Sequence, residues 1–145
     1  MRRRQFMAAC AGAASAAAAR RSSVAAPTIV RSVGHAHVKL RYDLFHEQIA
    51  EGNLIEKLEN NIDVVGIVHV AGVPGRHHPG TGEINYSNIF RKLAEQRYSR
   101  CVAMEFNPLG DRVKELRDAR ELAILSARSA SAARSFASRR EYGSA

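Results

Sequence analysis

The chain has 145 residues and a mass of 15.9 kDa, enough for one domain but too little for a complete (βα)8 barrel of about 250 residues. Hydrophobic residues make up 46% and charged residues 25%, and no run reaches the roughly 20 apolar residues of a membrane span. These values exclude a wholly disordered chain and an integral membrane protein. Two cysteines, Cys10 and Cys101, cannot build a disulfide framework or a paired-cysteine zinc site.

The net charge of +8 is concentrated at the two ends of the chain. Residues 1–41 carry eight Lys and Arg and no acid, whereas residues 42–127 carry ten basic and thirteen acidic groups. Arginines that neutralise phosphates would suit a nucleic-acid-binding protein. The chain shows no basic helix, stacking aromatic set or zinc finger, so we expect no nucleic-acid partner and interpret the charge as a targeting leader and a solvated tail.

The first 26 residues are predicted to be a leader and not part of the fold. Arginines are followed by an alanine-rich apolar run and then by small residues, the order of a secretory signal. The segment Arg3-Arg4-Gln5-Phe6-Met7 resembles a twin-arginine export signal. We therefore expect a periplasmic or secreted protein; a mitochondrial transit peptide is the alternative, because the segment is also rich in Arg and Ser. Residues 27–35 are taken as a linker.

The first predicted strand and helix follow this linker. Residues 38–42 alternate apolar and polar side chains and lead into Asp43, which is typical of a strand. Leu54, Leu58 and Ile62 recur every fourth residue, which indicates one helix.

The second and third units repeat this order. Residues 64–70 form a β-branched run typical of a buried strand, and a breaker-rich loop and a helix over residues 86–96 follow. Residues 101–104 predict the third strand, after which Asp111 is a plausible N-cap for a helix. That helix carries Val113, Leu116 and Ile124. Three βα units in series predict an α/β fold with a parallel sheet, and residues 126–145 read as a weak helical extension or a disordered tail.

Ligand-type residues close the three predicted strands. Asp43, His69 and Glu105 would converge, because the carboxyl ends of barrel strands form one face. Two carboxylates and an imidazole can hold Mn²⁺, Mg²⁺ or Co²⁺. The alternatives are a helix-capping Asp43, a core His69 and a surface Glu105. His46, one helical turn after Asp43, could bind substrate or orient a ligand, or be a half-exposed helix residue.

Three motifs in register identify a family resemblance. They are YDLFH with EGNL at residues 42–54, VPGRHHPGTGEINY at residues 73–86, and MEFNP at residues 104–108. In order and spacing they resemble the last three βα units of hydroxypyruvate isomerases, which are xylose isomerase-like TIM barrels. The resemblance covers about residues 36–125 and implies a partial TIM barrel.

The resemblance also implies roles for individual residues. Asp43 and His69 match metal ligands, and Glu105 matches a ligand that is also a catalytic acid/base. His46 and Arg76 match substrate-contacting positions. The implied activity is divalent-metal-dependent isomerisation of a small hydroxy-carbonyl acid or sugar, by proton transfer through an enediolate.

Nothing in the chain corresponds to the first five strands of such a barrel, including a fifth-strand glutamate that would be the second acid/base. Three βα units leave two sheet edges unpaired, which we expect a second copy or a complementing barrel half to cover. The alternative to an isomerase is therefore a truncated, non-catalytic barrel fragment or interaction module.

Overall fold

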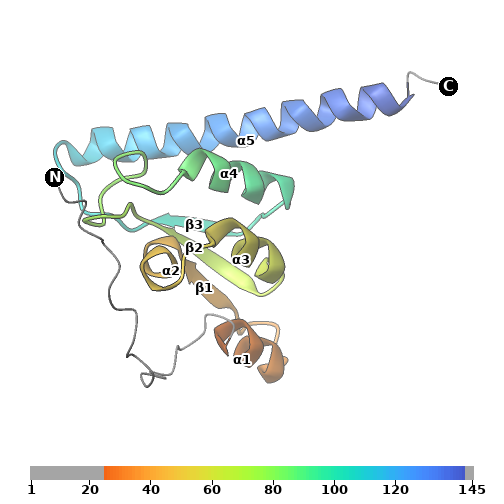
Figure 1. The fold of residues 1–145 in the computed structure, drawn as a ribbon, viewed down its shortest axis with the longest axis horizontal. Helices are drawn as coiled ribbons and strands as arrows, with labels where there is room; N and C mark the ends of the chain where they lie inside the picture. The colour runs from red at the N-terminus through yellow and green to blue at the C-terminus, as the bar shows by residue number, and fades with distance from the viewer. Residues whose placement is uncertain (1–24, 143–145) are drawn as a thin grey trace, which may run out of the picture.

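A computed structural model describes residues 25–142 of the chain, which form a three-stranded parallel sheet packed against helices (Figure 1). The strands lie side by side in sequence order, β1-β2-β3. Their bounds are β1 Leu40–Asp43, β2 Val65–Val70 and β3 Cys101–Met104. The helices are α1 Ala25–Val33, α2 Leu44–Ala50, α3 Leu54–Asn61, α4 Tyr86–Glu95 and α5 Arg112–Tyr142. The predicted α/β class and partial-barrel arrangement of three βα units are confirmed.

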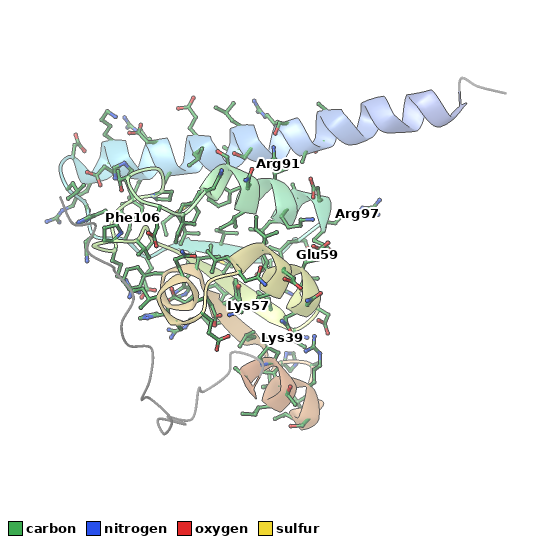
Figure 2. All side chains as sticks on the ribbon, in the orientation of Figure 1. Lys39, Lys57, Glu59, Arg91, Arg97 and Phe106 are labelled. Carbon is green, nitrogen blue, oxygen red and sulfur yellow. The ribbon has the colours of Figure 1, made fainter. Side chains whose placement is uncertain are left out.

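The register of the sheet places the predicted ligand residues next to one another. Asp43 is opposite His69, and His69 is opposite Ala103. Glu105 follows two residues after Ala103, so its side chain leaves the chain on the same side of the sheet. Figure 2 labels Phe106 at the end of the sheet where β3 finishes, and Glu59 and Arg97 at the opposite end. Because the strands are parallel, the carboxyl ends of all three lie at the same end of the sheet.

The core lies between the sheet and helices α2, α3 and α4. Its fully buried side chains include Leu44, Leu58, Val65, Val68 and Val70. Burial of each such side chain stabilises the fold by about 1.5–3 kcal/mol. This core fixes the strands, and with them the residues at the strand ends.

The helix predicted from Leu54, Leu58 and Ile62 corresponds to α3, and the structure adds a separate short helix, α2, which the sequence analysis did not predict. Helix α2 ends before Gly52, and α3 begins after Asn53. Both residues adopt positive φ angles, +67° and +55°. A left-handed backbone at two successive positions ends a right-handed helix, and glycine and asparagine adopt it most readily.

The structure assigns a helix to part of the segment taken as a linker. Helix α1 is fixed to the body by an ion pair between Arg31 Nη2 and Asp63 Oδ1, 2.7 Å apart. Residues 1–24 of the predicted leader lie outside the described residues.

Helix α5 runs along α4 and then past the rest of the fold (Figure 1). The predicted N-cap is confirmed, because Asp111 Oδ1 accepts from the backbone N–H groups of Val113 and Lys114 at 2.8 and 3.0 Å. The helix continues to Tyr142, so most of the predicted tail is helical. Its apolar Val113 and Leu116 are exposed, whereas the small Ala119 is buried. No helix in the described part of the chain has the length and apolar character needed to cross a membrane.

Candidate active site

Asp43 has a different role for each of its two carboxylate oxygens. Oδ1 accepts from the backbone N–H groups of Phe45 and His46, at 3.1 and 3.3 Å, and so caps helix α2. Oδ2 is buried and has no hydrogen-bond partner, in a residue that is 7% exposed. The helix-capping interpretation is therefore correct for one oxygen, and the other remains free for a ligand.

His69 and Glu105 complete a cluster with this free oxygen. The His69 Nδ1–H donates to Glu105 Oε2 at 2.5 Å, and Nδ1 lies 3.9 Å from Asp43 Oδ2. The backbone N–H of Glu105 donates to the carbonyl of Val70 at 3.0 Å, which ties Glu105 to the end of β2. One potential ligand atom from each of the three residues lies within 4.8 Å of the others.

The environment of Glu105 keeps its carboxylate ionised. The hydrogen bond from His69 and the charge of the nearby Arg76 guanidinium lower the pKa of Glu105 below its ordinary value. At neutral pH the side chain is thus a carboxylate, the form that can ligate a cation or accept a proton.

Arg76 lies over the cluster from the loop between β2 and α4. Its Nη2 is 2.8 Å from Glu105 Oε2 and 3.7 Å from Asp43 Oδ2, and its Nε donates to the Glu105 carbonyl at 3.3 Å. The guanidinium carbon lies 4.9 Å from the centre of the Phe45 ring, a cation–π contact. The backbone φ of Arg76 is +58°, a left-handed conformation that is uncommon for residues other than glycine.

His46 is the outermost member of the group. Arg76 Nη1 donates to His46 Nε2 at 3.1 Å, and that nitrogen lies 3.8 Å from Asp43 Oδ2. The His46 side chain is 60% exposed, so it is open to an incoming molecule. The structure therefore brings together all five residues singled out from the sequence.

Two supporting residues were not identified from the sequence. Phe45 lies beneath the guanidinium of Arg76, and its position between Asp43 and His46 is the available signal. Tyr86 anchors the Arg76 loop, since its hydroxyl donates to the Ala71 carbonyl at 2.6 Å and accepts from the Ala71 N–H at 3.1 Å. Burial raises the pKa of the Tyr86 phenol, which stays protonated and able to donate.

The donor set fits a divalent cation that prefers oxygen and imidazole ligands. Two carboxylates and one imidazole converge, and a buried carboxylate oxygen without a partner is costly unless a cation or hydrogen-bond donor satisfies it. The side-chain nitrogen atoms of His46, His69 and Arg76 nearest to Asp43 Oδ2 lie 3.7–3.9 Å from it, beyond hydrogen-bond distance.

The chain is similar to known isomerases. Residues 20–124 match the family model described as a xylose isomerase-like TIM barrel. A 2-oxo-tetronate isomerase from Cupriavidus necator is 38% identical over 80 residues, covering 55% of this chain and 31% of that protein. A hydroxypyruvate isomerase from Escherichia coli is 35% identical over 80 residues, with coverage of 55% and 31%.

The chain is also similar in structure to part of a solved protein with a different name. The crystal structure of an AP endonuclease, family 2, from Brucella melitensis aligns with a TM-score of 0.61 and 34% identity, covering 64% of this chain and 36% of that one. The chain thus spans about a third of the length of the curated relatives it matches.

Proposed function

Because this chain belongs to the xylose isomerase-like TIM barrel family, we propose that it supplies the metal and substrate site of a hydroxypyruvate isomerase-like enzyme. The substrate is a small α-hydroxycarbonyl acid of the size of hydroxypyruvate. The reaction moves a proton between neighbouring carbons through an enediolate. The observation that carries the proposal is the cluster of Asp43, His69 and Glu105 around a buried carboxylate oxygen that has no partner.

Asp43, His69 and Glu105 would hold the divalent cation. When bound, Mn²⁺, Mg²⁺ or Co²⁺ supplies Lewis-acid stabilisation of negative charge on the substrate's carbonyl and hydroxyl oxygens. His69 would offer Nδ1 to the cation in the tautomer that carries its proton on Nε2, and the hydrogen bond to Glu105 would then be replaced by ligation.

Glu105 is the proton-transfer residue in this proposal. Its lowered pKa keeps it ionised, and its side chain is 45% exposed at the open side of the cluster. The carboxylate takes the proton from the hydroxyl-bearing carbon of the substrate, and the electron pair left behind forms the enediolate. Reprotonation of the adjacent carbon, together with transfer of the hydroxyl proton to the oxygen on that carbon, completes the isomerisation.

Arg76 and His46 would bind the substrate. A guanidinium pairs with a carboxylate through two parallel hydrogen bonds, which suits the acid group of hydroxypyruvate. Arg76 is stacked on Phe45 and paired with Glu105, so it lies beside the reacting groups. His46 is exposed next to it and would contact a substrate oxygen.

Complete turnover needs a second proton-transfer group. The family resemblance assigns that role to a glutamate on the fifth barrel strand, which has no counterpart among the three described strands. We propose that further βα units, from a second copy or a complementing barrel half, pair with the edges of β1 and β3 and complete the site. Sedimentation analysis tests this, because a chain that stays at 15.9 kDa and has no partner would contradict it.

Exchange of the substrate proton with deuterium tests the role of Glu105 separately from complete turnover. The purified full chain is incubated with Mg²⁺ and hydroxypyruvate in D₂O, and ¹H NMR follows the CH₂ signal. Removal of that proton needs only the first transfer group, so exchange does not require the missing glutamate. We expect exchange about 100-fold above the protein-free rate, in the range that general base catalysis supplies.

Two variants give this experiment its control. Glu105→Gln should reduce exchange to the protein-free rate, whereas Asp118→Asn, which removes an exposed acid on α5 that pairs with Lys114, should leave it unchanged. Exchange that persists in Glu105→Gln, or that is absent in the wild type, would contradict the proposed base.

We also propose that the mature protein is exported by the twin-arginine pathway. The support is the order of residues at the N-terminus, with Arg3 and Arg4 ahead of an apolar run. A reporter fused behind residues 1–35 should be exported, and the double change Arg3→Lys and Arg4→Lys should block it. Import of the same fusion into mitochondria would contradict the proposal.

A further inference from the structure

A buried carboxylate on α5 holds the loop that follows Glu105. Glu115 is 6% exposed. Its Oε1 accepts from the backbone N–H groups of Leu109 and Gly110 at 3.0 and 2.6 Å, and its Oε2 lies 3.2 Å from the Leu109 nitrogen. The carboxylate thus fixes the end of the segment that begins at the proposed catalytic residue.

The same carboxylate reaches the loop that carries Arg76. His78 Nδ1 lies 3.1 Å from Glu115 Oε2, an ion-pair distance without the alignment of a hydrogen bond. The His78 ring packs 6.0 Å from the ring of Phe106, the residue after Glu105. Glu115 is therefore the point at which α5, the loop after β2 and the loop after β3 meet.

Direct contacts between the two loops transmit this anchoring to the site. The N–H of Asn107 donates to the Arg76 carbonyl at 2.7 Å, and the His77 Nδ1 lies 3.0 Å from the Asn107 carbonyl. Arg76 Nε in turn donates to the Glu105 carbonyl. Displacing Leu109 and Gly110 would therefore displace Arg76 and Glu105 together.

Helix stability alone does not account for Glu115. Asp111 already caps α5 through its contacts with Val113 and Lys114. A buried carboxylate is costly unless hydrogen-bond donors or opposite charge compensate it, and here the donors come from the loop. The burial of Glu115 is thus best explained by its hydrogen bonds to Leu109 and Gly110, and not by a contribution to the stability of α5.

We propose that Glu115 is a positioning residue that sets the placement of Glu105 and Arg76 for cation and substrate binding. This inference rests on the proposed function and deepens it, because it adds a residue outside the strand ends. Glu115 contacts neither the cluster nor a substrate, and it acts through Leu109, Gly110 and His78.

The test compares variants of Glu115 in the full chain by two readouts. The first is the NMR signal of the Arg76 Nε–H group, which needs no metal. The second is Mn²⁺ affinity measured by electron paramagnetic resonance. Glu115→Ala should shift the Arg76 signal and weaken Mn²⁺ binding about tenfold, the usual lower limit for residues that support metal ligands. Glu115→Gln keeps an acceptor for both N–H groups and should restore most of the affinity.

Two further variants control for folding and charge. Glu115→Asp keeps the charge but shortens the side chain by one methylene, so its effects should match those of the alanine variant. It replaces the alanine variant in this test if the alanine variant does not fold. Asp118→Ala removes an exposed acid from the same helix and should change neither readout.

The outcomes separate this inference from the proposed function. An unchanged Arg76 signal in the alanine and aspartate variants would overturn the positioning role, whether or not the chain binds Mn²⁺. A glutamine variant as weak as the alanine variant would also contradict it. Absence of Mn²⁺ binding in the wild type would instead contradict the proposed function, and the Arg76 signal would still decide the role of Glu115.

Discussion

The Nδ1 atom of His69 lies 2.5 Å from Oε2 of Glu105, although the two residues are 36 positions apart in the chain. The parallel register of β2 and β3 brings them together, because each residue lies at the carboxyl end of its strand. Asp43 joins them from β1 with one oxygen that caps a helix and one that is buried without a partner. Fold and site are thus fixed by the same strand pairing.

Removing His69 should raise the pKa of Glu105. The hydrogen bond from His69 is the main cause of the lowered value, and the Arg76 charge would keep it from returning fully to that of a free glutamate. In His69→Ala, Glu105 should therefore protonate at a higher pH than in the wild type. A ¹³C NMR titration of the Glu105 carboxyl measures this directly, and an unchanged midpoint would contradict the contact.

The Tyr86 hydroxyl should contribute to the stability of the Arg76 loop. Tyr86→Phe removes a group that both donates to and accepts from the backbone of buried Ala71, leaving an N–H and a carbonyl unsatisfied. We expect a loss of about 1–3 kcal/mol in the free energy of unfolding, measured by urea denaturation. Tyr98→Phe is the matched control, because its hydroxyl makes one bond, to the Cys101 carbonyl, from a half-buried position. Equal losses of unfolding free energy in the two variants would contradict the proposed contribution of the Tyr86 hydroxyl to the stability of this loop.

Arg76 should affect substrate and cation binding in opposite directions. Arg76→Ala removes a carboxylate-binding group and should lower hydroxypyruvate affinity by about tenfold or more, the equivalent of one charge-assisted hydrogen bond. It also removes a positive charge that lies 2.8 and 3.7 Å from the Glu105 and Asp43 carboxylates, so Mn²⁺ should bind at least as tightly as before. Calorimetric titrations with each ligand check both effects. If Arg76→Ala no longer binds Mn²⁺ but still binds hydroxypyruvate with wild-type affinity, the proposed substrate-binding role of Arg76 is contradicted.

Local sequence patterns predict the strands of this fold better than its helices. The apolar runs at residues 64–70 and 101–104 match β2 and β3 almost residue for residue, because buried parallel strands are short and continuously apolar. The spacing of Leu54 and Leu58 predicts only α3, whereas α2 is a separate helix because the backbone is left-handed at Gly52 and Asn53.

The candidate site is predicted from two different kinds of information. The strand-end positions of Asp43, His69 and Glu105 follow from periodicity, whereas Arg76 follows only from the motif resemblance, since its loop has no period. The buried Glu115 could not be predicted, because an acid in the first turns of a helix is usually exposed and its loop partners are backbone groups.

Titration of the full chain with Mn²⁺, followed by electron paramagnetic resonance in parallel with His69→Ala, tests most directly whether the three strand ends form a metal site. One saturable site per chain in the wild type, abolished in the variant, is the predicted result. Binding that never saturates, or that is the same in wild type and variant, would contradict the proposed site.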